Sequence, residues 1–325
     1  MVNFEYFEAT SLEGLPQLLG ADRNENVVMA GGTDLLDLLK ERLIRPRRVV
    51  NIKKIKELHG IKNGRGLDIG ALTVLADIAK NEKIRKTYTV LAQATGAVAN
   101  AQLRNMGTLG GNLCQRPRCW YFRGKEYVCL KKDGSKCFAA EGINKYHAIF
   151  GGGPCFIVHP SDSAPALRAL GASLEIYGPN GRRVMPIEEF FQLPEDNLLF
   201  ENRLAANEII TRIRVPEPAP GTRSIYLKFR EKQSMDFAIS SVAAVLQVQG
   251  DRVRKADIVL GGVAPIPWRA RAAEAELLGK ALTEAVIEKA AAAAVADADP
   301  LDHNKYKVLL TRNLVKDALL RLRSA

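Results

Sequence analysis

The five cysteines of this chain lie within one stretch, and this clustering constrains the fold more than any other feature of the sequence. They are Cys114, Cys119, Cys129, Cys137 and Cys155, and the rest of the chain has none. Their number is odd, and the N-terminal residues MVNFEYFEAT show no basic region followed by an apolar stretch, so we expect no secretory signal. A disulfide framework is therefore disfavoured, and the cluster predicts a metal site.

The segment that carries the cysteines, residues 114–155, differs from the chain on either side. It is rich in Cys, Arg, Lys and Gly and shows little sustained hydrophobic periodicity, so we expect an insertion whose order does not come from a hydrophobic core. Its basic character predicts lowered cysteine pKa values, which would favour thiolates. Because His147 and His159 are nearby, these residues alone fit a structural zinc and an iron–sulfur cluster about equally well.

Outside this segment, the hydrophobic pattern alternates between strands and helices. A strand NVVM, a glycine turn AGGTD, a helix LLDLLKERL and a strand VVNI follow one another near the N-terminus. Next, ELHGI and LDIGAL predict two strands joined by the turn NGRG. From about residue 222, SIYLKFRE, FAISSVAAVLQVQG and KADIVLGGVA predict strands or a mixture of strand and helix, whereas RAAEAELLGKALTEAVIEKAAAAAVADA and YKVLLTRNLVKDALLRLR predict helices. This change of pattern predicts a separate α+β domain at the C-terminal end.

Two glycine loops stand out in the N-terminal half. They are Ala30-Gly31-Gly32-Thr33-Asp34 and Thr108-Leu109-Gly110-Gly111-Asn112. Glycine lets a backbone turn sharply and approach a ligand closely, and consecutive N–H groups can then bind an anion. Two such loops could hold a pyrophosphate from both sides, although neither is a GxGxxG or P-loop motif and each alone fits an ordinary turn.

Seven motifs occur together in an order that is far more specific than either loop. They are AGGTDLL, IGALT, TLGGNL, HPSD followed by APAL, EIITRIRVP, YLKFRE followed by DFAISSVA, and GGVAPIPWRA. They extend over nearly the whole chain, which resembles the FAD-binding medium subunit of the xanthine dehydrogenase and carbon monoxide dehydrogenase family. The resemblance implies an α+β fold, with a two-subdomain α/β FAD-binding domain of the PCMH type followed by a smaller α+β C-terminal domain.

The resemblance also guides the expected domain boundaries. We expect residues 1–221 to form the FAD-binding domain, with subdomains of about 1–55 and 56–221 and the cysteine-rich insertion 114–155 inside the second. Residues 222–325 would form the C-terminal domain of the flavoprotein subunit.

The same resemblance implies the residues that bind FAD. Residues 30–36 resemble the first pyrophosphate loop, and residues 108–112 resemble the second, in which Thr108 and Asn112 offer side-chain hydrogen bonds. The predicted loop residues are Ala30, Gly31, Gly32, Thr33, Asp34, Leu35, Leu36, Thr108, Gly110, Gly111 and Asn112.

Outside the loops, the resemblance implies contacts near the flavin ring. Asp162 matches an acidic position that contacts FAD in relatives, although it also fits a helix N-cap before SAPALRAL. Ile209 or Ile210 falls where relatives place an apolar contact on the ring. Lys228 matches a lysine near the flavin, where a cation would stabilise the anionic reduced form.

The cysteine segment resembles a subset of this family. In most members a Ser-Asp pair follows the GGN loop within a few residues, whereas here the whole segment separates Asn112 from Asp162. The 4-hydroxybenzoyl-CoA reductase flavoprotein subunit and the FAD subunit of periplasmic-type aldehyde oxidoreductases carry an inserted [4Fe–4S] cluster, and the pattern here resembles the aldehyde oxidoreductase type. Cys114 would be a small buried residue near the flavin. The cluster ligands that the resemblance implies are Cys119, Cys129, Cys137 and Cys155.

The function implied by the resemblance is electron transfer inside a complex, a heterotrimer or its dimer. A molybdenum cofactor on a large partner subunit would hydroxylate the substrate. Electrons would then pass through [2Fe–2S] clusters of a small subunit to the FAD of this chain, and on to an external acceptor. Two alternatives stay open. One is a subunit of a 4-hydroxybenzoyl-CoA reductase-type enzyme that works in the reductive direction, and the other is a non-catalytic binding module stabilised by a structural zinc.

Charge and hydropathy exclude other classes of protein. The net charge is +11, but the basic residues are dispersed, aromatic residues make up only 6%, and no nucleic-acid motif occurs, so we expect no nucleic-acid partner. No apolar run of about 18 residues occurs, so we expect no membrane span. We therefore expect a cytoplasmic location, or a periplasmic one through export with a signal-bearing partner.

Overall fold

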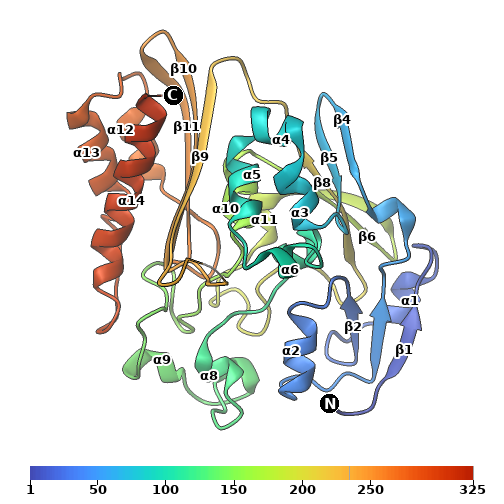
Figure 1. The fold of residues 1–325 in the computed structure, drawn as a ribbon. Helices are drawn as coiled ribbons and strands as arrows, with labels where there is room; N and C mark the ends of the chain where they lie inside the picture. The colour runs from blue at the N-terminus through green and yellow to red at the C-terminus, as the bar shows by residue number, and fades with distance from the viewer. Residues whose placement is uncertain (234, 325) are drawn as a thin grey trace.

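The computed structural model describes residues 1–233 and 235–324 and arranges them around three β-sheets (Figure 1). The first sheet is parallel, in the order β1-β3-β2. Its strands and helices are β1 (Glu5–Glu8), α1 (Leu15–Leu19), β2 (Asn26–Met29), α2 (Leu35–Lys40) and β3 (Arg48–Asn51). The predicted order of strand, glycine loop, helix and strand is confirmed, since parallel neighbours need a crossover and α2 supplies it between β2 and β3.

The second sheet is antiparallel, in the order β4-β5-β8-β6-β7. Its strands are β4 (Ile61–Gly64), β5 (Gly66–Gly70), β6 (Ser173–Gly178), β7 (Gly181–Pro186) and β8 (Ile209–Val215). The accompanying helices are η1 (Lys56–Leu58), α3 (Leu75–Lys80), α4 (Glu82–Thr87), α5 (Thr89–Gly96), α6 (Ala101–Arg104), α7 (Leu109–Leu113), α10 (Ser163–Ala169) and α11 (Ile187–Phe190). The strand predicted over ELHGI is wrong at its start, because Lys56–Leu58 forms a 3₁₀ turn and pairing begins only at Ile61.

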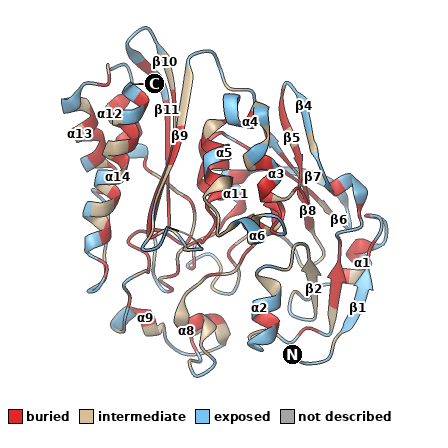
Figure 2. Ribbon diagram, viewed as in Figure 1, coloured by how far each residue is buried: buried red, intermediate tan, exposed pale blue. Residues whose placement is uncertain are grey.

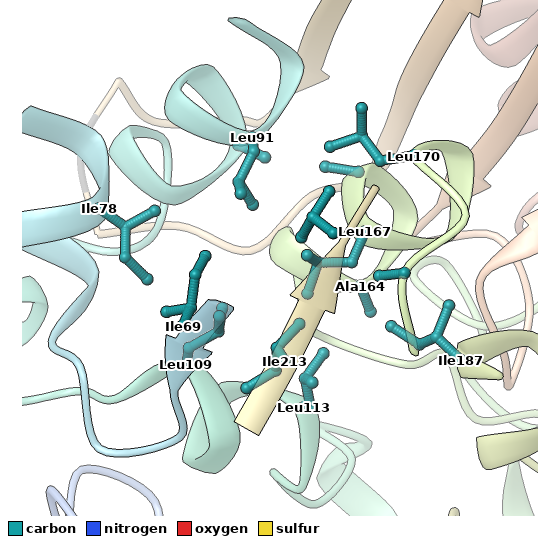
Figure 3. Close-up of a cluster of buried hydrophobic side chains, with 14 of the residues drawn as sticks. Ile69, Ile78, Leu91, Leu109, Leu113, Ala164, Leu167, Leu170, Ile187 and Ile213 are labelled. Carbon is teal, nitrogen blue, oxygen red and sulfur yellow. The ribbon is translucent and has the colours of Figure 1, made fainter. Parts of the chain in front are cut away.

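Side chains from the sheet strands and from helices, including α7 of the second glycine loop, form the core of this central part. Figure 3 shows Ile69 and Ile213 of the sheet meeting Leu91 of α5, Leu109 of α7 and Leu167 of α10. The helix that carries the second glycine loop is therefore anchored in the core rather than lying on the surface.

The third sheet is antiparallel, in the order β12-β11-β10-β9. The elements of this part are β9 (Thr222–Phe229), β10 (Ser240–Gln249), β11 (Arg252–Gly261), β12 (Trp268–Arg269), α12 (Arg271–Leu277), α13 (Glu284–Ala293) and α14 (Tyr306–Arg323). The expected strands and the C-terminal helix are confirmed. The stretch RAAEAELLGKALTEAVIEKAAAAAVADA is helical as expected, but it forms two helices, because the chain leaves helical geometry at Leu278 before α13 begins.

The third sheet is covered on both faces, which explains the almost uninterrupted apolar run of β10. Val242, Ala244 and Leu246 pack into a core shared with the C-terminal helices. Ala243, which points to the opposite face, packs into the central core beside α5 and α10. Figure 2 shows the result as buried strands between helices, in contrast to β1, which is exposed along its length.

The cysteine segment forms a small layer that lies beside α2 (Figure 1). Its elements are α8 (Trp120–Arg123), the 3₁₀ turn η2 (Leu130–Lys132) and α9 (Phe138–Glu141). We expected its order not to come from a hydrophobic core, and the segment does have some apolar contacts of its own. Tyr121 contacts Tyr127 with ring centroids 4.9 Å apart, and Tyr127 lies 5.2 Å from Phe138, so edge-to-face aromatic contacts order the segment.

None of the helices that the structure describes is both long and apolar enough to span a bilayer.

A fully buried lysine fastens α14 to the end of the cysteine segment. The ammonium of Lys307 donates hydrogen bonds to the carbonyl oxygens of His147 at 2.9 Å and Gly262 at 2.6 Å. Burial lowers the pKa of Lys307 from 10.5 to about 7. The folded chain therefore binds this proton less tightly than the unfolded chain, and protonation below pH 10.5 favours unfolding.

This burial predicts a pH-dependent stability. The free energy of unfolding of the wild type should increase by about 2 kcal/mol between about pH 7 and about pH 9, because the penalty of the charged lysine diminishes. Lys307→Met should lack this increase, and Lys305→Met, at an exposed neighbouring lysine, should retain it. Chemical denaturation at both pH values measures the free energy of unfolding. An equal change between the two pH values in all three proteins would contradict the prediction.

Candidate cofactor site

The two glycine loops pack directly against each other. A Cβ atom placed on Gly31 would lie only 2.0 Å from the carbonyl oxygen of Met106, so any larger residue would force the loops apart. Gly111 faces the same region, where its Cβ would lie 3.9 Å from that of Ala30. The sequence-predicted loop residues are thus brought together, although the loops are far apart in the chain.

The first loop offers unpaired backbone donors. Among the described residues, the N–H groups of Gly31, Gly32 and Thr33 have no hydrogen-bond acceptor. Successive free N–H groups at a tight turn form a concave site for an anion. This loop is therefore suited to hold a phosphate through its backbone.

The second loop uses its backbone differently. The N–H of Leu109 donates to Thr73 at 3.0 Å, that of Gly110 donates to Ala71 at 2.9 Å, and that of Asn112 donates to Thr108. Among the described residues, the second loop thus lacks the row of free backbone donors found in the first. Gly110 is needed for packing, since its Cβ would lie 2.9 Å from that of Ala71. The donors that remain are on side chains: the hydroxyl of Thr108, which accepts from the Gly111 N–H at 3.2 Å, and the amide of Asn112.

Asn112 is oriented by the turn that follows the cysteine segment. The Ser161 hydroxyl donates to Asn112 Oδ1 at 2.5 Å and accepts from the N–H of Ala164 at 3.0 Å. The Asn112 Nδ2 group has no partner among the described residues and is left to donate elsewhere. Asp162 stands at the N-cap position of α10, as the sequence suggested, but its side chain makes no capping hydrogen bond, and the Ser161 hydroxyl accepts from the helix N–H instead.

Asp162 instead belongs to a buried polar network with the third sheet. Its carboxylate accepts from the Tyr226 hydroxyl at 2.6 Å and from Lys228 Nζ at 2.7 Å. The side chains of Asp162 and Lys228 are each only 4% exposed. Burial raises the pKa of Asp162, and the charge of Lys228 opposes that rise. Tyr226 was not predicted from the sequence, although it lies two residues before Lys228 and therefore on the same face of β9.

The structure does not bring Ile209 and Ile210 to this network. Ile209 packs into the core of the first sheet, and Ile210, on the other face of β8, packs into the central core. Their contact with a flavin ring remains a prediction.

A cavity of about 200 Å³ joins the turn at Asp162 to the cysteine segment. Its lining includes Ser161, Asp162, Cys119, Trp120, His147 and Phe237. One candidate flavin residue, Asp162, and one candidate metal ligand, Cys119, thus border the same space.

Four of the five cysteines lie near one another, and one of them, Cys119, lines this cavity. Cys119 and Cys129 contact the same small core, and Cys129 and Cys137 both act electrostatically on Cys119. Cys137 in turn interacts with Cys155. Cys114 stands apart and has Arg23 as its charged neighbour. The separation of Cys114 from the other four agrees with the ligand set expected from the resemblance, which stays a prediction.

The expectation that the basic surroundings lower the cysteine pKa values is wrong for most of these residues. Burial raises the pKa of Cys119 to about 11 and that of Cys114 to about 12. The interaction with Cys155 lowers the pKa of Cys137 to about 6 and raises that of Cys155 itself. Desolvation of the thiolates outweighs the dispersed positive charge.

Within residues 1–233 and 235–324, no group of three or more His, Cys, Asp and Glu side chains has the geometry of a metal site. The thiols make other contacts, and Nε2 of His147 lies 3.2 Å from the Cys119 sulfur. Burial lowers the pKa of His147 to about 4, so its imidazole is neutral near pH 7 and available as a hydrogen-bond partner. The other nearby histidine, His159, is buried in the turn before Asp162, where its ring packs on Phe191.

Comparison with known proteins covers the whole chain. Residues 2–218 match the family described as the FAD binding domain in molybdopterin dehydrogenase, and residues 224–322 match the CO dehydrogenase flavoprotein C-terminal domain. The aldehyde oxidoreductase FAD-binding subunit PaoB of Escherichia coli is 37% identical over 300 residues, which are 91% of each chain. The carbon monoxide dehydrogenase medium chain of Hydrogenophaga pseudoflava is 32% identical over 97% of this chain and 96% of its own length.

The fold leads to the same relatives. The structure of carbon monoxide dehydrogenase from Hydrogenophaga pseudoflava that lacks the Mo-pyranopterin moiety superposes with a TM-score of 0.79, at 31% identity, over 99% of this chain and 98% of its own. The chain therefore belongs to the xanthine dehydrogenase and molybdenum hydroxylase family, as an FAD-binding medium subunit.

Proposed function

We propose that this chain transfers electrons between [2Fe–2S] clusters of a small partner subunit and an external acceptor, and that it carries a [4Fe–4S] cluster besides FAD. A large partner subunit with a molybdenum cofactor would hydroxylate the substrate, and the likeness to PaoB favours an aldehyde. The observation that carries this proposal is the shared cavity, which borders both the turn at Asp162 and the thiol of Cys119.

The residues of the two loops fit the pyrophosphate of FAD. Gly31, Gly32 and Thr33 have free N–H groups, and Thr108 and Asn112 add a hydroxyl and an amide. We infer that residues 30–36 and 108–112 hold the pyrophosphate within a domain of residues 1–221, and that residues 222–325 cover the flavin end. FAD supplies the redox chemistry there. The buried ammonium of Lys228, held by Asp162, favours negative charge beside it, and Ile209 or Ile210 would supply an apolar contact for the ring.

The donor set of the cysteine segment fits a cubane cluster, which takes four thiolates. Cys119, Cys129, Cys137 and Cys155 influence one another, whereas Cys114 does not share their surroundings. One observation favours zinc instead, because a neutral His147 lies beside Cys119 and zinc accepts mixed Cys and His ligands. Metal analysis decides between the two.

The first prediction concerns FAD. Asn112→Asp is isosteric and keeps the oxygen that accepts from Ser161, but it replaces the free amide donor with a carboxylate oxygen. The affinity for FAD should fall by roughly 10- to 100-fold, because the hydrogen bond from the Asn112 amide is lost and the new carboxylate repels the negatively charged pyrophosphate. Flavin fluorescence titration measures the affinity. Asn105→Asp is the control, since this exposed residue adds the same charge near the loop, and equal affinities in the two variants would contradict the proposed contact.

The second prediction concerns the metal. Wild-type chain produced anaerobically with sufficient iron should contain about four irons, the number in a [4Fe–4S] cluster. Replacing Cys119, Cys129, Cys137 or Cys155 by Ser should lower the iron content, and Cys114→Ser should leave it unchanged. Iron analysis and low-temperature EPR of each variant measure this. Loss of the cluster in Cys114→Ser, or stoichiometric zinc without iron in the wild type, would show that the assignment is wrong.

The third prediction concerns the partners. The chain purified from its native source should elute with a larger and a smaller subunit, because it has neither a molybdenum site nor a [2Fe–2S] motif of its own. Aldehyde oxidation should require all three subunits. Turnover of an aldehyde or a purine by this chain alone would rule the proposal out.

A further inference from the structure

The carboxylate of Asp34 faces the cysteine segment, although Asp34 belongs to the first glycine loop. Its Oδ2 accepts from the backbone N–H of Arg116 at 2.8 Å. Its Oδ1 lies 2.8 Å from Nη2 of Arg118 and 2.8 Å from Nη2 of Arg123. Asp34 is only 16% exposed and Arg123 only 15%, so these charge-assisted bonds are partly shielded from water.

The three arginines surround a candidate metal ligand. Arg118 directly precedes Cys119, and Arg123 ends α8, which begins just after that cysteine. Arg123 also donates to the carbonyl oxygens of Pro117 at 2.9 Å and Arg116 at 3.2 Å, so the turn that presents Cys119 is tied together around Asp34.

An apolar contact reinforces the polar one. Leu38, one turn after Asp34 on α2, is 4% exposed and packs in a small core with Phe122 and Cys129. The glycine loop and α2 therefore link the free N–H groups to two candidate metal ligands. Asp34 binds the arginines beside Cys119, and Leu38 packs near Cys129.

A second carboxylate holds the cysteine segment without touching the loop. Glu201 lies 2.7 Å from Lys131 Nζ and 2.8 Å from Arg116 Nε. It lies in the chain between β7 and β8, outside both glycine loops. Glu201 is therefore a matched reference for Asp34, since it is another carboxylate that anchors the segment; both bind Arg116, but Glu201 belongs to neither glycine loop.

We propose that Asp34 is a positioning residue that couples occupancy of the flavin loop to the order of the cysteine segment. This inference rests on the proposed function, in that FAD binds to the loop through residues 31–33. Binding fixes the loop, the fixed loop holds the Asp34 carboxylate toward Arg118 and Arg123, and the turn at Cys119 is ordered in consequence. By linkage the coupling is reciprocal, so an ordered segment also strengthens the binding of FAD.

Hydrogen exchange of the full-length chain with and without FAD tests the coupling. In the wild type, saturating FAD should slow amide exchange in residues 114–155 by about tenfold, within the usual range of coupling between sites. In Asp34→Asn, which is isosteric but uncharged, FAD should still slow exchange in residues 30–36 but leave residues 114–155 unchanged. Glu201→Gln should speed amide exchange in residues 114–155 both with and without FAD, and FAD should still slow that exchange. If Asp34 only stabilised the segment, Asp34→Asn would show the same pattern as Glu201→Gln.

The outcomes distinguish a failure of the coupling from a failure of the proposed function. Flavin fluorescence establishes that FAD occupies every variant before exchange is compared. Equal protection of residues 114–155 in the wild type and Asp34→Asn, or no protection in the wild type with FAD bound, overturns the coupling and leaves the FAD site standing. Failure of the wild type to bind FAD overturns both. A wild type that binds FAD but contains no iron overturns the cluster alone, because the exchange measurement does not depend on the metal.

Discussion

The buried ion pair between Lys228 and Asp162 is the contact on which the arrangement of the cofactor site depends. Each side chain is 4% exposed, so removing one would leave the other charge buried and uncompensated, which costs about 3–5 kcal/mol in proteins. The pair joins β9 of the third sheet to the turn before α10. In the same turn, Ser161 binds Asn112 of the second glycine loop, so three distant segments are fixed by one polar network.

Local hydrophobic patterns in the sequence predicted most of the strands and helices, but not all of the positions at which they end. The apolar run of β10 indicated a strand because both faces of the sheet are covered, and the crossover from β2 through α2 to β3 followed from the glycine turn and the helical period. The stretch from Arg271 onward is helical as expected, but alanine-rich sequence fits a helix throughout and does not indicate the break at Leu278, which lets α13 pack against both α12 and α14. Propensity alone contains no information on such packing.

The residues that the sequence did not predict act through long-range contacts. Asp34 fitted a ligand contact because it stands in the AGGTD motif, whereas its arginine partners lie 82 and 89 residues farther along the chain. Glu201 and Lys131 pair over a similar separation, and neither stands in a recognisable motif. Tyr226 is different, because the two-residue period of a strand places it beside Lys228, and that signal was present in the sequence.

The raised pKa values of buried cysteines determine what the proposed metal would have to supply on binding. Burial raises the pKa of Cys119 to about 11 and also raises the pKa of Cys155, so these thiols carry protons near neutral pH. A metal binds thiolates and releases those protons, so its binding must supply the free energy of ionising thiols in a poorly hydrated place. The ties of the segment to Asp34 and Glu201 would reduce the remaining cost, because they hold the backbone near its final position before the metal binds. The proposed metal would then have only to replace local contacts, such as those of Cys119 with His147 and of Cys137 with Cys155.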